Sequence, residues 1–347
     1  MVVGVDETVA ALKIAVPADA NIERWWPNGY GNQKLYSLTV TFTPAAAAAA
    51  AAALAASRSA SASAVPNTTG SRALPQHTTA AQRVPAPQSK VVQVGFRTIE
   101  IDQPALPEGY GDGRLFQYVV NSKPIYVRGS NWVPAQTLKT RVTTQTLQRH
   151  FDAFRSAHYN LLRVWGGGVY ATDEFLHMAD VAGIIILHDF QFGDQFYPTN
   201  DAFLSNVAAE VRDNVWRMGS HASLGVWCGN NEMAVGYSAQ NHHFLSAHAF
   251  YSKLYFATVL SNASAVDPNR AIVSSTPALG NETAATPFNR NANIELRGDM
   301  HFYLPTPGNC WNVSRFPRPR MLTEFGFKFL AIIPYYGAVP EHRRQRL

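Results

Sequence analysis

Two glutamates stand at the ends of short apolar segments, in patterns that suit chemistry. Glu232 closes the stretch SLGVWCGNNE (residues 223–232) directly after two asparagines, and Glu324 lies within MLTEFG (residues 321–326). A segment that only packs a core does not usually end in amides and an acid, because such groups would be buried without partners. We therefore treat both carboxylates as candidates for acid–base or nucleophilic work.

Paired carboxylates are the groups that glycoside hydrolysis requires. One acid protonates the leaving oxygen, and in a retaining enzyme the other attacks the anomeric carbon, at a carboxyl separation of about 5–5.5 Å. Whether Glu232 and Glu324 meet depends on the elements that carry them.

From about residue 116 onward, short apolar segments alternate with amphipathic helices, which is typical of α/β architecture. Thr172 is expected to N-cap one of these helices and Gly183 to end it. Seven strands are expected, at residues 124–129, 160–165, 184–188, 224–228, 271–275, 299–303 and 320–325. The pattern predicts a (β/α)8 TIM barrel with its active site at the C-terminal ends of the strands. Because no eighth unit is evident, the barrel is expected to be incomplete and C-terminally truncated.

A doubly wound sheet is the alternative α/β architecture. It normally places a glycine-rich phosphate loop after the first strand, and the sequence has none there. The segment WGGGVY (residues 165–170) lacks a following Lys-Ser/Thr and is interpreted as a tight turn.

The first 115 residues have a different sequence pattern. Strand-like alternation at residues 34–42 and 91–101 is interrupted by nine alanines (residues 45–53) and a Ser/Thr/Pro/Gln-rich stretch. This insertion, at about residues 44–89, lacks the large apolar side chains that would offset the entropy of ordering it, so we expect it to be disordered. We predict a partial β-sandwich over residues 1–115 and the barrel over residues 116–347.

The composition excludes several classes of protein. The 347 residues are 46% hydrophobic and 15% charged, enough for a large core, and the net charge of +5 comes from scattered basic residues, so no nucleic-acid partner is expected. No apolar stretch reaches the roughly 18 residues that span a bilayer, and the N-terminus does not have the pattern of a signal peptide. Two cysteines, Cys228 and Cys310, make no disulfide framework.

Asn-x-Ser/Thr sequons occur at four positions and together favour a secretory or lysosomal protein. These positions are Asn67, Asn262, Asn281 and Asn312.

Several longer motifs resemble the β-mannosidases of glycoside hydrolase family 2. They are RWWPNGYGNQ (24–33), RGSNWVPA (128–135), LLRVWGGGVY (161–170), HASLGVWCGNNE (221–232), DMHFY (299–303) and MLTEFGF (321–327). The resemblance covers roughly residues 21–43 and 91–328. It implies the tail of an immunoglobulin-like β-sandwich domain followed by most of a catalytic TIM barrel, so the chain is expected to be truncated at both ends.

The resemblance also implies roles for individual residues. Glu232 would be the general acid/base and Glu324 the nucleophile. Asn231 would bond the sugar 2-hydroxyl. No cofactor and no metal are implied.

Four further residues would line the substrate pocket. Arg163 and Trp165 match a pocket-lining pair, Tyr303 matches a tyrosine that bonds the nucleophile, and Asp189 matches the aspartate of a QDF motif. The sequence departs from the family beside that aspartate, where Leu187 and His188 replace Trp-Gln, and after it, where QFGDQF (191–196) replaces small and thiol residues.

The expected activity is that of a retaining exo-β-mannosidase. It would remove terminal, non-reducing β-D-mannose from oligosaccharides such as those of N-glycan breakdown, by double displacement, in the lysosome or secretory pathway. His188 and His301 with Asp189 suggest a metal site only weakly, because no close His-x-x-x-His spacing supports it, and ordinary hydrogen-bonded histidines are expected.

Two alternatives remain open at this stage. One is a β-galactosidase or β-glucuronidase of the same family. The other is an inactive, truncated glycan-binding fragment, because an unclosed barrel exposes two strand edges. The sequence does not indicate an oligomeric state.

Overall fold

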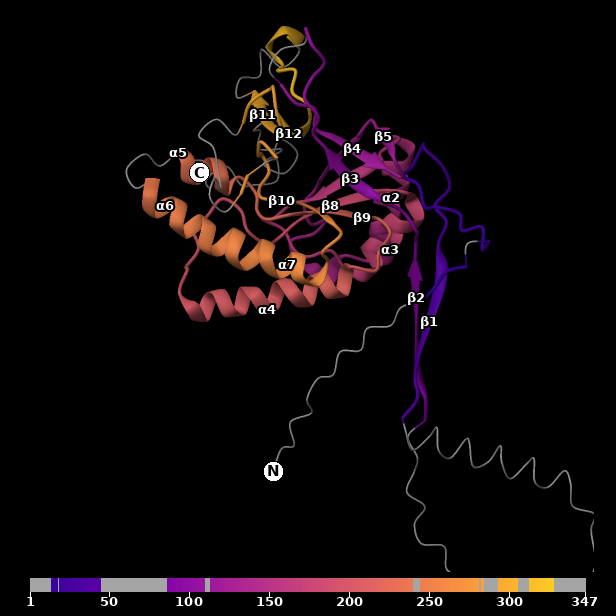
Figure 1. Ribbon diagram of the computed structural model, residues 1–347. Coiled ribbons are helices and arrows are strands. Elements are labelled where there is room, and N and C mark those ends of the chain that lie inside the picture. Colours follow the sequence, from indigo (N-terminus) through magenta and orange to yellow (C-terminus); the bar gives the residue numbers. More distant parts are fainter. Residues whose placement is uncertain are drawn as a thin grey trace, which may run out of the picture. The chain divides into compact units, whose positions relative to one another are not determined.

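A computed structural model describes residues 14–17, 19–44, 86–109, 113–239, 244–280, 282–283, 293–304 and 312–327 (Figure 1). The chain divides into two compact units, residues 36–94 and residues 1–35 with 95–347. The predictions made for Asn67, Asn281, Cys310 and most of the low-complexity insertion fall outside the described residues.

Strands and helices alternate over most of the described chain. The strands are β1 (Tyr36–Phe42), β2 (Gln88–Val94), β3 (Ile99–Asp102), β4 (Gln117–Val120), β5 (Lys123–Ile125), β6 (Gly129–Trp132), β7 (Leu161–Val164), β8 (Ile185–Asp189), β9 (Leu224–Cys228), β10 (Ala271–Val273), β11 (Met300–Leu304) and β12 (Leu322–Phe327). The helices are α2 (Thr144–Ser156), α3 (Asp173–Ala182), α4 (Asp201–Met218), α5 (Met233–Ala239), α6 (Phe244–Tyr251), a π-helix (Ser252–Leu260) and α7 (Ser261–Val266). None of the helices in these described ranges is long and apolar enough to cross a membrane.

The described residues of the unit 36–94 form one antiparallel pair of strands. β1 pairs with β2 from Tyr36 opposite Val94 to Phe42 opposite Gln88. The strand-like pattern expected at residues 91–101 corresponds to two strands, β2 and β3, which belong to different sheets. The immunoglobulin-like sandwich over residues 1–115 stays a prediction.

Strands β3, β4 and β5 form a three-stranded antiparallel sheet. β4 and β5 are joined by Asn121 and Ser122, whose φ angles of 50° and 68° fit the type I′ turn that matches strand twist. The strand expected at residues 124–129 is therefore wrong in part. Its first residues belong to β5, and the parallel strand begins only at Gly129.

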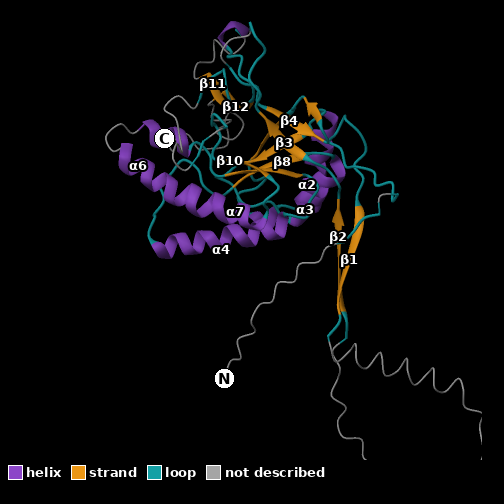
Figure 2. Cartoon of the chain, viewed as in Figure 1, coloured by secondary structure: helices purple, strands orange, loops and turns teal. Residues whose placement is uncertain are grey.

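Five strands form a parallel sheet in the order β10-β9-β8-β7-β6. Helices α2, α3 and α4, labelled in Figure 2, lie in the connections. Side-chain caps begin these helices: the amide N–H of Phe175 donates to the Thr172 hydroxyl at the start of α3. Gly183 ends α3 in the left-handed conformation, with φ of 72°. The predicted start and stop of this helix are confirmed.

The central strands are buried on both faces, as expected for a parallel sheet covered on both sides. One face packs on the helices through residues such as Leu162 and Ile186. The opposite face carries Leu161 and Ile185, which pack with residues of β3–β5. Since side chains alternate along a strand, Arg163 at the end of β7 and Asp189 at the end of β8 lie on this second face.

β11 and β12 form a separate parallel pair, with His301 opposite Glu324. The side chain of Asn131 in β6 donates to the backbone oxygen of Thr323 in β12 at 3.0 Å, which ties this pair to the edge of the five-stranded sheet. The α/β class with parallel strands is confirmed, whereas the incomplete (β/α)8 barrel of about seven strands stays a prediction.

Candidate active site

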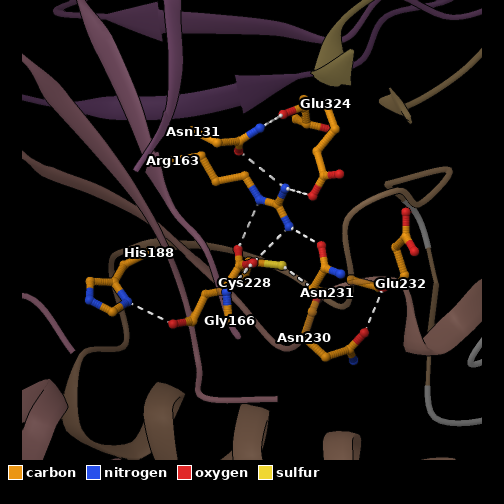
Figure 3. A network of polar contacts seen from close by, with 12 residues as sticks. Asn131, Arg163, Gly166, His188, Cys228, Asn230, Asn231, Glu232 and Glu324 are labelled. Atoms are coloured by element: carbon orange, nitrogen blue, oxygen red, sulfur yellow. Dashed lines mark hydrogen bonds and ion pairs between the residues drawn. The ribbon is translucent and has the colours of Figure 1, made fainter. Parts of the chain in front are cut away.

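Arg163 is the centre of a buried polar network at the carboxyl ends of the strands (Figure 3). Only 2% of its surface is exposed. Its Nε and Nη2 atoms donate to the two oxygens of Asp189 at 3.2 and 2.7 Å, a bidentate pair of the kind that fixes a guanidinium in one plane. Asp189 also accepts from the backbone N–H of Gly166 at 3.0 Å, which the tight turn after β7 supplies.

The remaining donors of Arg163 reach three other strand ends. Nη1 donates to Glu324 at 2.7 Å and to Asn131 at 3.3 Å, and Nη2 donates to Asn231 at 2.6 Å. A guanidinium has five N–H donors, so each of them has an acceptor. The network therefore needs β6, β7, β8, β12 and the end of β9 to be in place together.

The charge of Arg163 is held by its carboxylate partners. Burial lowers the pKa of Arg163, but Asp189 and Glu324 outweigh that effect and hold the pKa above its ordinary value. Since Asp189 is fully buried, its negative charge would destabilise the fold if Arg163 were absent. The ion pair with Asp189 fixes the guanidinium of Arg163 in place, and Glu324 is held beside that positive charge.

Glu324 is the more enclosed of the two candidate glutamates, with 8% of its surface exposed. One carboxylate oxygen accepts from Arg163, and the other accepts from the Tyr303 hydroxyl at 2.5 Å. Burial, followed by the hydrogen bond to Glu324, raises the pKa of Tyr303, so the phenol stays a donor. Both oxygens of Glu324 are thus oriented by neighbours on other strands.

Glu232 lies just beyond β9 in a strained backbone conformation, with φ of 57°. A glutamate rarely adopts this left-handed region, and such outliers cluster at active sites. Asn230 supports the turn, since its side-chain oxygen accepts from the N–H of Met233 and from the hydroxyl of Ser275. The Glu232 side chain is 40% exposed and one oxygen lies 2.7 Å from Nδ1 of His301.

The two glutamates face each other across His301. One oxygen of each carboxylate and a ring nitrogen of His301 all lie within 4.8 Å of one another. These three groups could approach a metal ion, but a metal-bound imidazole normally donates its other N–H. Nε2 of His301 is buried and has no hydrogen-bond partner in the described part of the chain, so the donor set fits a metal poorly.

His188 lies on the other face of β8, away from the carboxylates. Its Nε2 accepts from the N–H of Ala171 at 3.1 Å, so Nδ1 is the protonated nitrogen and donates to the backbone oxygen of Asp189 at 2.7 Å. Burial lowers the pKa of His188 to about 4. His188 is a neutral hydrogen-bonded histidine of the core.

Six of the seven predicted catalytic and substrate-binding residues belong to this one network. They are Asn231, Glu232, Arg163, Asp189, Tyr303 and Glu324. Trp165 follows β7 and is half-buried, and its ring covers Gly167, where an added Cβ would lie 2.1 Å from the ring. The part that each of these residues takes in catalysis or sugar binding stays a prediction.

Two further members of the site lie on strands that the sequence places at its edge, Asn131 in β6 and His301 in β11. His301 lies two residues before Tyr303 and therefore on the same face of β11. One member, Asp194, was not singled out from the sequence. Asp194, which accepts from Asn231 at 3.1 Å, lies in a loop and carries no such signal.

The described sequons differ in accessibility. Asn262 lies within α7, where its amide donates to the backbone oxygen of Thr258 and accepts from Arg212. Asn312 is exposed and caps a short 3-10 helix, with its oxygen accepting from the N–H and the hydroxyl of Ser314. Cys228 is buried and donates to the backbone oxygen of Asn230.

Known proteins resemble this chain over most of its length. β-Mannosidase of Mus musculus is 30% identical over 93% of the chain, which covers 33% of that protein. β-Mannosidase A of Aspergillus aculeatus is 30% identical over 87% of the chain and is covered to 30%. This chain is a relative of the β-mannosidases. The resemblance expected from the motifs is confirmed, and the chain spans about a third of the length of the relatives it matches.

The fold of this β-mannosidase relative is also found among solved structures. The crystal structure of β-D-mannosidase from Dictyoglomus thermophilum matches with a TM-score of 0.61 and 23% identity, over 88% of this chain and 32% of that one. This likeness concerns the fold alone. No protein-family model matches the chain.

Proposed function

We propose that this chain carries the catalytic site of a retaining exo-β-mannosidase, which removes terminal, non-reducing β-D-mannose from oligosaccharides. One observation carries the proposal: the oxygens of Glu232 and Glu324 approach within 4.8 Å. That spacing suits a nucleophile and an acid/base, because an inverting enzyme needs about 6.5–9.5 Å to admit a water molecule between its carboxyl groups.

Glu324 acts as the nucleophile. Its carboxylate attacks the anomeric carbon and forms a glycosyl-enzyme, while the bond to the leaving oxygen breaks. Arg163 and Tyr303 orient both carboxylate oxygens before the attack, so little reorganisation is needed during the reaction.

Glu232 acts as the acid and then as the base. In its protonated form it donates to the leaving oxygen, and as a carboxylate it takes a proton from the water that hydrolyses the glycosyl-enzyme. Its partial exposure gives it access to leaving group and water, and His301 holds it beside Glu324. Asn231 bonds the 2-hydroxyl of the sugar, and Trp165 and Asp189 help shape the pocket.

Covalent trapping tests the proposal directly. Incubation with 2-deoxy-2-fluoro-β-D-mannosyl fluoride should add one fluoromannosyl group, and peptide mapping should place it on Glu324. The matched variant E324Q, which keeps the shape and loses the charge, should take up no label. A folded chain that is not labelled by this reagent, but is labelled by its galactosyl or glucuronyl counterpart, would contradict the mannose specificity.

Azide separates the roles of the two glutamates. In E232A the added azide should displace Glu324 from the glycosyl-enzyme and give the β-mannosyl azide. In E324A it should attack the substrate itself and give the α-mannosyl azide. The same anomer from both variants would contradict the assignment.

A lysosomal or secretory location belongs to the same proposal. The exposed sequon at Asn312 supports it. Expression through a eukaryotic secretory pathway should give a mobility shift that a glycosidase treatment removes and that N312Q reduces, whereas N262Q, within a helix, should leave the shift unchanged.

A further inference from the structure

Asp194 adds a third carboxylate to the mouth of the candidate active site. It lies in the loop after β8, whose residue Gly193 forms a parallel bridge with Asn231. One oxygen of Asp194 accepts from Nδ2 of Asn231 at 3.1 Å, and the residue is exposed. Asp194 falls in the segment QFGDQF, where the sequence departs from the small and thiol residues of the family it resembles.

The backbone at Asp194 is in the left-handed region, with φ of 57°. Aspartate tolerates this conformation better than most residues. The conformation places the carboxylate against Asn231, so the local geometry is compatible with an aspartate at this position.

The side chain of Asn231 is fixed from both sides. Its oxygen accepts from Arg163 at 2.6 Å, and one of its two N–H groups donates to Asp194. An amide nitrogen carries two hydrogens, so among the described residues the second N–H of Asn231 is left for a ligand. Beside that donor, Asp194 offers a negatively charged acceptor.

The charges around this position are unbalanced. Glu232 and Glu324 face the same space, where Arg163 is paired with Asp189 and Glu324, and His301 lies 2.7 Å from Glu232 and 3.6 Å from Glu324. Partial desolvation of its carboxyl, and next the charge of Glu232, raise the pKa of Asp194 above its ordinary value. A cationic group would relieve this excess of negative charge.

We propose that Asp194 is a specificity-determining residue that recognises the substituent at C2 of the bound sugar and favours an ammonium group there. The substrate class of the site would then extend to β-glycosides of 2-amino-2-deoxyhexoses. The inference rests on the proposed function, because that function places Asn231 at the 2-position of the sugar. An ammonium at C2 would donate to Asp194 in a charge-assisted hydrogen bond, which is stronger than a bond from a hydroxyl.

Binding of two matched probes tests the inference without turnover. The probes are methyl β-D-mannopyranoside and methyl 2-amino-2-deoxy-β-D-mannopyranoside, which differ only at C2. Titration followed by NMR, at a pH where the amine is protonated and Asp194 is ionised, gives the ratio of the two Kd values. We expect D194N to raise the Kd of the amino sugar about tenfold relative to that of the mannoside, as loss of one charge-assisted bond implies.

D194N is a suitable variant because its side-chain oxygen can still accept from Asn231. It removes the negative charge and keeps the hydrogen bond that holds Asn231. D201N is the control, since Asp201 is a carboxylate with 98% of its side chain exposed at the start of α4, and it should leave the ratio unchanged. An unchanged ratio in D194N, or a wild type that binds neither probe, would overturn the inference. The trapping experiment is an independent test. If Glu324 is labelled but D194N leaves the ratio of the two Kd values unchanged, only this inference is contradicted. If D194N changes the ratio but Glu324 is not labelled, only the proposed activity is contradicted.

Discussion

The two ends of the parallel sheet both bury charged side chains, but they satisfy them in different ways. At the amino end, the half-buried Arg97 donates to the backbone oxygens of Ala222 and Leu224 at 3.0 and 2.7 Å, and Arg270 donates to the backbone oxygens of Leu224 and Gly219 in addition to its ion pair with Asp267. At the carboxyl end, every bond of Arg163 goes to a side chain.

This difference separates structural charges from functional ones. An arginine that bonds backbone oxygens, such as Arg97, holds the segments that carry those oxygens. A charge that bonds carboxylates and amides sets their orientation while their other atoms face outward. Arg97 and Arg163 thus show two uses of arginine at opposite ends of one sheet: the first holds backbone oxygens, and the second orients carboxylates and amides.

Removal of Arg163 should have the largest effect. R163M leaves Asp189 buried without its partner, so we expect the free energy of unfolding to fall by about 3–5 kcal/mol. Urea denaturation followed by circular dichroism measures this loss. The double variant R163M/D189N, which removes the stranded charge, should recover part of it, and equal stability for R163M and the wild type would remove the distinction between the two ends.

His188 should make the carboxyl end sensitive to acid. Its pKa is lowered from 6.5 to about 4 in the fold. The unfolded chain therefore takes up a proton first as the pH falls, and the stability present above pH 6.5 should decrease by about 3 kcal/mol by pH 4. Urea unfolding at several pH values should show this slope reduced in H188Q, and an identical slope in that variant would place the acid sensitivity elsewhere.

Loss of Arg97 should affect stability alone. R97M removes two hydrogen bonds to backbone oxygens, so we expect about 1–3 kcal/mol of lost stability. Hydrolysis of 4-nitrophenyl β-D-mannopyranoside by the folded variant should stay within about threefold of the wild type. A large fall in kcat with unchanged stability would show that the amino end also takes part in the site.

The strain at Glu232 should be measurable by comparing two small residues. E232G and E232A both remove the carboxylate, but only alanine keeps a Cβ in the left-handed region. We expect E232G to be more stable than E232A by about 1 kcal/mol. Thermal unfolding of the two variants compares them, and a more stable E232A would mean that the backbone relaxes at this position.

The sequence predicts the buried strands well because they are continuous apolar segments. The expected strands at residues 160–165, 184–188 and 224–228 agree closely with β7, β8 and β9. β6 was misplaced, because Gly129–Trp132 has a polar sequence with no apolar run. Its strand character comes from pairing with β7, where Gly129 packs so closely that an added Cβ would lie 1.9 Å from the backbone oxygen of Leu161.

The membership of the site was easier to predict than its geometry. Strand ends identify Glu232, Glu324, Arg163 and Asp189. The hydrogen-bond partner of each Arg163 donor depends on the distances between the ends of neighbouring strands. No local sequence pattern predicts those distances. Asp194 was missed for the same reason, since its partner Asn231 is fixed by a bridge between two loops.

The hydrogen-bond partners of Arg163 are synthesised at different times. As the chain leaves the ribosome, Asp189 follows Arg163 by 26 positions, whereas Glu324 follows by 161. The buried cation therefore meets its strongest partner early in synthesis, and the carboxylate proposed as nucleophile is the last member to arrive. The ion pair of Arg163 with Asp189 can therefore form before Glu324 has been synthesised, whereas a complete site requires that β12, the last of these strands, has reached β6 and β7.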